Sequence, residues 1–523
     1  MKCSREFVAV GLIVSLQTLI AWGQVHVTTY HNDNFRTGQN VAETVLSPSN
    51  VNHVQFGKLF THGVDGYVYA QPLYLPNVSI PGRGVHNVVF VATQHDSVYA
   101  FDADNNSGSN ANPLWAVSFT NPTAGITTLS SNDVSCTDIV PEIGITGTPV
   151  IDPSTATLYV VVKTKESGKA VQRLHALSVG TGGEKFGGPV VIHASVSGSG
   201  LGGNGTTVTF DPLKANQRPG LLLQNGVVYI GWAGHCDNGP YHGWLMAYNA
   251  STLEQLGVFN STPNGTTGGF WQAGAAPASD SSGNVFVATG NGSFDGATEF
   301  SDSILKLKLG TGLQRHDYFT PYNQAALNAN DLDLGSGGTL LIPDDQPGAH
   351  PHILVQAAKE GKIYLVDRDN MGGFNFAGDT QIVQSIPYSV GGMWSMAAYW
   401  NSTVYLLGSF DVLRAFVLSN GLLSKSPIAM GNTVFGFPGA TPSISANGSN
   451  HGIAWVLQTD QFQVRGRAVL RAYDATNLVE LYNSNQNVRR DSPGPAVKFT
   501  VPTVANGKVY VGTENGLSVY GLR

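Results

Sequence analysis

The densest group of chemically capable side chains in the sequence lies between residues 234 and 244. His235, Cys236 and Asp237 are followed by His242, so two histidines, a cysteine and an aspartate occur within eight residues. These residue types suit a transition metal, but their spacing matches no standard zinc site. The same pattern is compatible with ordinary loop residues, so the sequence alone leaves both interpretations open.

A second group lies about a hundred residues earlier in the chain. Cys136 and Asp138 are followed by Glu142. The two carboxylates could line a common floor with Asp237, or they could be solvated acids of a loop. A disulfide between Cys136 and Cys236 would tie the two groups together, but two distant cysteines do not define the geometry that such a bond needs.

The composition indicates that β-strands position these side chains. Hydrophobic residues make up 42% of the 523 residues and charged residues only 12%, against roughly 25% charged in an average soluble domain. The 63 Gly and 26 Pro favour many short strands joined by turns over a helical bundle. A net charge of -7 with 28 Lys plus Arg excludes a generally basic nucleic-acid binder. No nucleophile elbow, phosphate loop or dinucleotide fingerprint is present.

A repeat of two adjacent strands runs along the chain and predicts an all-β fold. The eight copies lie at residues 88–102, 158–177, 228–249, 285–307, 353–367, 404–416, 454–474 and 508–520. A short strand with a Pro or Gly precedes each copy, at residues 71–73, 148–150, 219–221, 276–278, 338–340, 393–395, 441–443 and 501–503. A fourth strand follows most copies, which predicts an eight-bladed β-propeller; two smaller propellers or a solenoid is the alternative.

The ends of the chain give two further predictions. The last copy stops at Arg523 without its fourth strand, so we expect residues 55–60 to close the ring and cover the open sheet edge. Residues 1–23 have the pattern of a signal peptide, with Lys2 and Arg5 before an apolar run and small residues before Gln24. We therefore expect residues 24–523 to form a single propeller, secreted or periplasmic, without a transmembrane segment.

Several local motifs resemble those of the pyrroloquinoline quinone (PQQ) dehydrogenases that oxidise methanol and ethanol, and the resemblance covers nearly all of the mature chain. Residues 285–292 (VFVATGNG) resemble the strand whose end supplies a calcium-ligating Asn, which implies Asn291. Residues 331–334 (DLDL) with 352–368 are similar to the segment whose cation contacts the quinone, which implies Lys359. Residues 391–397 resemble another cofactor-side strand, in which Trp394 matches a Trp.

The chemistry of these residues agrees with that resemblance. Calcium takes roughly six to eight oxygen ligands, and Asp237 and Asn291 each offer oxygen from loops expected to meet at the propeller axis. Lys359 would suit an acidic quinone. Each residue also has a structural interpretation, because Asn291 and Lys359 stand in turn-like sequences and Trp394 could belong to the core.

The catalytic base is the least secure part of the resemblance. Glu299 and Asp302 lie in the loop where the family carries its catalytic Asp, and we take them as the candidates for proton acceptor. Neither stands in the family's Pro-Gly-Asp-Asn context, and the adjacent Cys-Cys pair of many relatives is missing. The sequence also lacks a Cys-x-x-Cys-His haem motif, so electrons would leave by another route.

Two functional hypotheses therefore remain after the sequence analysis. The first is a calcium- and PQQ-dependent oxidoreductase that acts on an alcohol or sugar. The second is a non-catalytic propeller that binds a protein or glycan through its loop-rich face, because this fold also serves as a cofactor-free scaffold in outer-membrane assembly lipoproteins. A cation site and an aromatic slot at the axis would favour the first hypothesis.

Overall fold

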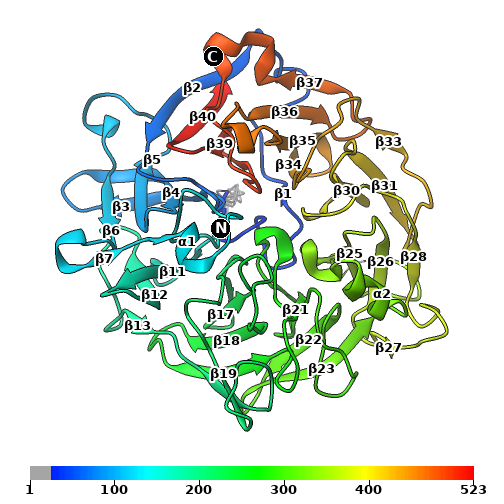
Figure 1. The fold of residues 1–523 in the computed structure, drawn as a ribbon. Helices are drawn as coiled ribbons and strands as arrows, with labels where there is room; N and C mark the ends of the chain where they lie inside the picture. The colour runs from blue at the N-terminus through cyan, green and yellow to red at the C-terminus, as the bar shows by residue number, and fades with distance from the viewer. Residues whose placement is uncertain (1–24, 345) are drawn as a thin grey trace, which may run out of the picture.

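The computed structural model describes residues 25–523 apart from residue 345, and it is an eight-bladed β-propeller (Figure 1). The predicted signal peptide and its cleavage site lie outside the described residues. Among the described residues, no helix has the length and apolar character needed to cross a membrane. The three α-helices are short surface elements: α1 (Ser131–Val134), α2 (Gln324–Ala329) and α3 (Val488–Asp491).

The first four blades are antiparallel sheets that follow one another along the chain. Blade 1 contains β3 (Leu73–Ile80), β4 (Gly84–Thr93), β5 (Ser97–Asp102) and β6 (Trp115–Ser118). Blade 2 contains β10 (Val150–Asp152), β11 (Thr157–Glu166), β12 (Lys169–Ser178) and β13 (Val190–Val191), with β7 (Ile126–Thr127) paired to β11. Blade 3 contains β16 (Leu222–Gln224), β17 (Val227–Trp232), β18 (Trp244–Asn249) and β19 (Gln255–Asn260). Blade 4 contains β20 (Ala278–Ser279), β21 (Val285–Ala288), β22 (Ile304–Leu309) and β23 (Leu313–Thr320), with β27 (Gly373–Phe374) added at its edge.

The remaining blades follow the same plan. Blade 5 contains β24 (Leu340–Leu341), β25 (Ile353–Ala357), β26 (Ile363–Asp367) and β28 (Gln384–Ile386). Blade 6 contains β29 (Ala398–Trp400), β30 (Thr403–Leu406) and β31 (Arg414–Ser419), the last paired with β32 (Leu422–Leu423) and β33 (Ala429–Met430). Blade 7 contains β34 (Ser443–Asn447), β35 (Asn450–Gln458), β36 (Val469–Asp474) and β37 (Glu480–Asn483). Blade 8 contains β38 (Thr503–Ala505), β39 (Lys508–Gly512), β40 (Gly516–Leu522) and β2 (Phe56–Gly63).

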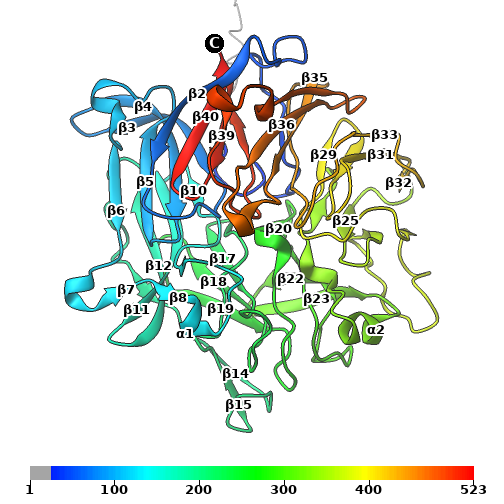
Figure 2. The same cartoon turned by 45° about the horizontal axis from the view of Figure 1, so that its top comes forward.

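Two small hairpins lie outside the blades. They are β8 (Leu129–Ser130) with β9 (Glu142–Ile143), and β14 (Ser195–Ser197) with β15 (Thr207–Thr209), which projects from the ring (Figure 2). Such insertions explain why the repeat spacing exceeds that of compact blades.

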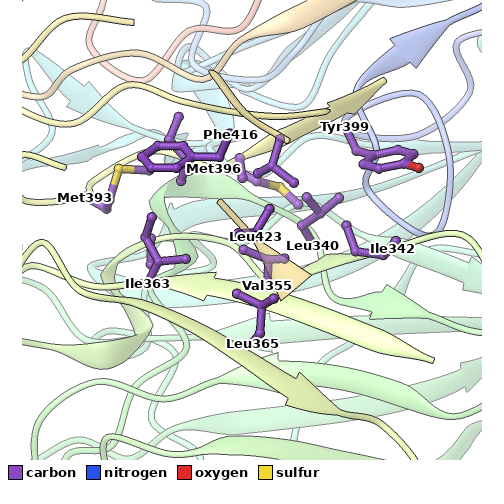
Figure 3. Close-up of a cluster of buried hydrophobic side chains, with 14 of the residues drawn as sticks. Leu340, Ile342, Val355, Ile363, Leu365, Met393, Met396, Tyr399, Phe416 and Leu423 are labelled. Atoms are coloured by element: carbon purple, nitrogen blue, oxygen red, sulfur yellow. The ribbon is translucent and has the colours of Figure 1, made fainter. Parts of the chain in front are cut away.

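Apolar side chains between neighbouring blades form the core. Figure 3 shows this between blades 5 and 6, where Leu340, Val355 and Leu365 pack near Phe416 and Leu423 in one buried cluster. Because each sheet is covered on both faces, its middle strands are almost continuously apolar. This is why the strand pairs could be recognised in the sequence.

The N-terminal strand β2 closes the ring, as predicted. It pairs antiparallel with β40, from Phe56 opposite Leu522 to Gly63 opposite Gly516. The Phe56 ring packs against those of Trp455, Tyr482 and Tyr520, with centroids 5.0 to 6.3 Å apart. The strand therefore joins blade 8 both by backbone hydrogen bonds and by aromatic packing.

A second closure, not predicted from the sequence, lies at the centre of the ring. Residues 27–40, here called the axial segment, pass the innermost strands of all eight blades in order and include β1 (Gln39–Asn40), near the centre of Figure 1. The contacts run from Val27 to β3, Thr28 to β10, Asn34 to β16 and β20, Phe35 to β24, Thr37 to β29, Gly38 to β34 and Asn40 to β38. In each blade the partner is the second residue of the innermost strand. The axial segment therefore fills the channel with a set of equivalent hydrogen bonds.

Two predicted innermost strands do not match the structure: the strand predicted at residues 219–221 begins only at Leu222, and the one at residues 393–395 is wrong. Residues 393–395 were expected to form the innermost strand of blade 6, but that strand is β29, which begins at Ala398. Residues 393–395 belong to the preceding loop, where Ser395 Oγ donates to Leu407 O at 2.9 Å. Trp394 therefore lies in a loop near the axis and not in the sheet of blade 6.

Candidate functional site

A cavity of about 220 Å³ opens where loops from several blades converge. The side chains that line it are Asp138, Arg218, Cys236, Asp237, Trp271, Ala273, Asp333, Ser336, Lys359, Trp394, Phe437 and Phe499. They come from loops that precede the innermost strand of a blade or connect its second and third strands. In an antiparallel blade both kinds of loop lie on the same face, here called the cavity face. Residues from blades 2 to 8 can meet only near the axis, so the cavity is axial.

Lys359 is the centre of a charged network in this cavity. Its Nζ lies 2.5 Å from Asp333 Oδ2 and 2.7 Å from Asp331 Oδ1. Burial lowers the pKa of Lys359, but the carboxylates of Asp333 and Asp331 outweigh that effect, so the pKa is raised. Lys359 is therefore a fixed cation held between two aspartates.

Asn291 belongs to the same network. Its backbone N–H donates to Asp333 Oδ1 at 2.6 Å and its Nδ2 donates to Asp331 Oδ1 at 2.8 Å. Its Oδ1 is buried and has no hydrogen-bond partner among the described residues. An unsatisfied buried oxygen is costly, so this atom is the one in the network most suited to receive a cation or a donor from a ligand.

Asp237 approaches this network from blade 3. It follows Cys236, which forms a disulfide with Cys136 across 100 residues of sequence. Burial raises the pKa of Asp237, a hydrogen bond from the Tyr241 hydroxyl opposes the rise, and the nearby Asp333 carboxylate adds to it. The two aspartates thus repel each other in a partly desolvated site, which favours a cation between them.

Aromatic side chains form one wall of the cavity. The Trp394 and Phe437 rings are 5.2 Å apart, and the Phe437 and Phe499 rings are 6.2 Å apart. Lys359 Nζ lies 5.8 Å from the Trp394 ring centre. Trp271 and the disulfide supply further apolar surface. The cavity can therefore hold a flat ligand that carries charged or polar groups at its edges.

The two candidate bases do not line this cavity. Glu299 accepts a hydrogen bond from the backbone N–H of Asn264 at 2.9 Å, in a surface loop of blade 4. Asp302 is fully buried and accepts from Leu334 N at 3.1 Å. Burial, with the Asp333 carboxylate as the next cause, raises the pKa of Asp302 to about 8. The structure thus brings Asp237, Asn291, Lys359 and Trp394 together at the axis and leaves Glu299 and Asp302 outside the cavity wall.

Sequence reasoning missed several cavity residues that share one signal. Each stands four to seven residues before the innermost strand of its blade, and they are Arg218, Trp271, Asp333, Phe437 and Phe499. Because that stretch enters the blade from the cavity face, large or charged residues at this offset mark the axial site. Asp333 belongs to the family-like segment 331–334, but the sequence did not indicate that it lines the cavity.

The histidine and cysteine cluster near residue 236 has other partners than a metal. His235 Nε2 lies 2.8 Å from Lys163 Nζ, and burial with the Lys163 charge lowers the pKa of His235 to about 2. The His242 ring nitrogens contact the carbonyl oxygens of Thr262 and Leu201 at 2.9 and 3.0 Å. In the part of the chain that the structure describes, no three His, Cys, Asp or Glu side chains form a metal-binding group. Of the second cluster, Asp138 lines the cavity, whereas Glu142 contacts His95 instead.

Comparisons with known proteins agree with the fold. No protein-family model matches the chain, and no curated protein matches it in sequence. A quinohemoprotein alcohol dehydrogenase from Comamonas testosteroni is similar with a TM-score of 0.60 and 14% identity, over 95% of this chain and 80% of that one. The quinohemoprotein alcohol dehydrogenase ADHIIG from Pseudomonas putida HK5 gives 0.58 and 13%, with the same coverage. BamB from Moraxella catarrhalis gives 0.49 and 12%, over 89% of this chain and 97% of that one. The chain therefore has the eight-bladed β-propeller fold of the quinohemoprotein alcohol dehydrogenases.

Proposed function

We propose that this protein is an exported oxidoreductase that uses PQQ and calcium to oxidise an alcohol or sugar, with the axial cavity as its active site. The observation that supports this best is that one cavity combines aromatic faces, the partly buried cation Lys359 and the carboxylates of Asp237 and Asp333, with Asn291 hydrogen-bonded to Asp333 behind them. Few ligand classes need a flat slot, a cation and a metal-binding edge together, and an acidic quinone is one of them.

The residues present fit PQQ. Trp394 and Trp271 offer aromatic faces, and Lys359 offers a positive charge beside Trp394. PQQ, when bound, would supply the two-electron acceptor for the carbon-bound hydrogen of the substrate. In this assignment Lys359 contacts the quinone oxygens and Trp394 orients the ring system.

The residues also fit a calcium ion, although not a complete cage. Asn291 Oδ1 is an orphaned buried oxygen, and the carboxylate of Asp237 is destabilised by its neighbour Asp333. A divalent cation would satisfy the first and relieve the second. Calcium, when bound, would supply a positive charge that polarises substrate oxygen. Asp237 and Asn291 are the residues that would hold it, and the remaining ligands would have to come from bound molecules.

Asp333 is the carboxylate best placed to take the substrate hydroxyl proton. It lies in the cavity wall, whereas Glu299 and Asp302 do not. The Lys359 ammonium group, 2.5 Å from Asp333 Oδ2, holds the carboxylate in one orientation. Asp333 thus replaces the two bases expected from the sequence.

Export and electron transfer complete the proposal. A disulfide persists in oxidising compartments, which agrees with a secreted or periplasmic location. Both cysteines of the expected mature chain are used in that bond, and the sequence lacks a haem motif. Reduced cofactor would therefore pass its electrons to a separate acceptor.

The proposal can be tested with purified full-length protein, PQQ and calcium. We expect saturating PQQ with calcium to raise the melting temperature by mass action, to quench tryptophan fluorescence and to support reduction of an artificial dye by primary alcohols or sugars. Asn291→Ala and Lys359→Ala should abolish the stabilisation. Asp333→Asn should keep PQQ binding and lose dye reduction, while the exposed Arg467→Gln serves as a control. No thermal shift and no quenching at saturating PQQ and calcium would reject the proposal.

A second candidate function rests on a different observation. Tyr388, Phe410 and Val464 are 87%, 78% and 73% exposed, and all three stand in cavity-face loops of blades 5 to 7. Exposed apolar side chains gathered on one face are typical of interaction surfaces. If PQQ does not bind, a propeller that binds a protein or glycan through this face is the better account.

A further inference from the structure

Arg218 is a buried arginine at the axis. It precedes β16 of blade 3, is 4% exposed, lines the cavity, and its guanidinium lies 4.3 Å from the ring centre of Phe499. Phe499 precedes β38 of blade 8, on another side of the ring. Since loops of these two blades meet only near the axis, the guanidinium group lines the cavity close to the axis.

The guanidinium group has no hydrogen-bond acceptor among the described residues. The acidic residue that most affects the pKa of Arg218 is Asp138, and the Asp138 carboxylate is already paired with Lys498 Nζ. Burial lowers the pKa of Arg218, and Asp138 only partly offsets this. Counting these three groups, the Arg218 side of the cavity carries one excess positive charge. A buried charge without direct partners is costly, so this arrangement indicates a place prepared for an anion.

Negative charge is concentrated in another part of the same cavity. Asp237 and Asp333 face one cation, Lys359, which Asp331 also contacts. Counting these four groups, this side carries an excess of negative charge, so a carboxylate of the substrate is better placed beside Arg218. The cavity therefore favours a ligand with an anionic end and a neutral polar end, and it fixes which end lies where.

We propose that Arg218 binds a carboxylate of the substrate, so that among alcohols and sugar derivatives the preferred substrate is a hydroxy acid such as an aldonate. A guanidinium group presents paired N–H donors that match the two oxygens of a carboxylate. The Phe499 ring limits its rotation by stacking on one face. The hydroxyl end of the same molecule then lies toward Asp333. Naming the acid as the substrate rests on the proposed function, whereas the carboxylate site itself does not.

The test compares a matched pair of ligands with and without a carboxylate. Titration calorimetry of the full-length protein would measure D-gluconate against D-glucitol. We expect gluconate to bind about ten- to a hundredfold more tightly, as a charge-assisted hydrogen bond contributes. Arg218→Gln should remove that difference, Arg218→Lys should keep part of it, and the exposed Arg467→Gln should leave it unchanged.

Two further measurements separate this role from a structural one and from cofactor binding. Because Arg218 has no hydrogen bond to lose and only its stacking on Phe499 would be given up, Arg218→Gln without ligand should melt close to the temperature of the unsubstituted protein, and its affinity for PQQ should be unchanged. Equal binding of gluconate and glucitol, or a loss of PQQ affinity in Arg218→Gln with gluconate binding intact, would overturn the inference. Gluconate binding that depends on Arg218, in a protein that does not bind PQQ, would support it and reject only the proposed oxidoreductase.

Discussion

Two buried arginines at the axis differ in one respect, their hydrogen bonds. Arg36, in the axial segment, is 0% exposed and donates five hydrogen bonds, to Thr29 Oγ1, Tyr30 O, Asp33 O and, twice, Pro277 O. Arg218 is 4% exposed and donates none to the described residues. Burial lowers the pKa of Arg36 to about 9. An arginine whose N–H groups all donate hydrogen bonds within the protein stabilises the fold. An arginine at a cavity whose N–H groups have no acceptor in the protein is available to bind a ligand.

His31 of the axial segment is also fully hydrogen-bonded, although the buried Tyr30 hydroxyl beside it has no partner among the described residues. The His31 ring nitrogens each lie 2.7 Å from a carbonyl oxygen, of Arg36 and of Pro442. Gly38 has a φ of +69°, and a Cβ there would fall 2.1 Å from His31 Nε2, so no other residue fits. Tyr30 of the same segment packs against Gly220, next to the Arg218 loop. The axial segment is therefore held in place by hydrogen bonds, whereas Arg218 in the cavity next to it can bind a ligand.

Removal of the N-terminal closure should have the largest effect. Deleting residues through Phe60 removes the axial segment and most of β2, which exposes the edge of β40 and the innermost strands. An exposed strand edge promotes aggregation. We expect loss of the cooperative thermal transition and aggregation in light scattering. A deleted protein that melts like the full chain would show that neither closure matters.

Arg36→Met should have the second largest effect on stability. This substitution tests the comparison of the two arginines directly. The substitution leaves several buried carbonyl oxygens without donors, each of which costs about 1–3 kcal/mol. We expect urea denaturation to show a loss of about 3 kcal/mol or more. Arg218→Met is the matched control and should cost nothing. Similar losses for both would mean that hydrogen-bond saturation does not separate structural from functional arginines here.

Removal of the disulfide should have an intermediate effect on stability and should also weaken ligand binding in the cavity. Cys136→Ser with Cys236→Ser opens a link across 100 residues, which typically costs about 2–4 kcal/mol. Asp138 and Asp237 stand next to these cysteines and line the cavity. Gluconate or PQQ binding should therefore weaken as well. Unchanged ligand affinity in a destabilised variant would restrict the disulfide to a structural role.

The fold could be predicted because its signal is repeated. Each blade shows the same apolar strand pair, and the missing last strand pointed to residues 55–60 as the closing strand, as found. The axial segment could not be predicted, since most of its contacts to the eight blades are backbone hydrogen bonds that leave no pattern in side-chain types, and only Asn34 and Asn40 use their side-chain amides. The strand expected at residues 393–395 was wrong because a Trp and a Met there resemble core residues.

The site was predicted only in part for a related reason. Asn291 and Lys359 stand in motifs that resemble a family, so they were found, and the structure places them in one network. Arg218 and Asp333 matter because residues distant in sequence surround them, and no local motif encodes that. Glu299 and Asp302 were chosen by their position in a loop, but they accept hydrogen bonds from Asn264 N and Leu334 N and are not among the residues that line the cavity.

The smallest effect we expect comes from Asp302, a buried carboxyl that contrasts with the exposed acids of the surface. Its folded-state pKa of about 8 lies above the ordinary value of 3.8, so the folded protein holds a proton that the unfolded chain releases between these values. Stability from this group is therefore highest at low pH and declines as the pH rises from about 4 to 8. Asp302→Asn cannot ionise and still accepts from Leu334 N, so it should have the higher melting temperature at pH 8 and match the unsubstituted protein near pH 4. Glu254→Gln, at an exposed carboxylate, is the control and should show no such divergence. Parallel stability curves for Asp302→Asn and the unsubstituted protein across this range would mean that Asp302 is already ionised in the folded state, and that a cation compensates the acidic network beside it.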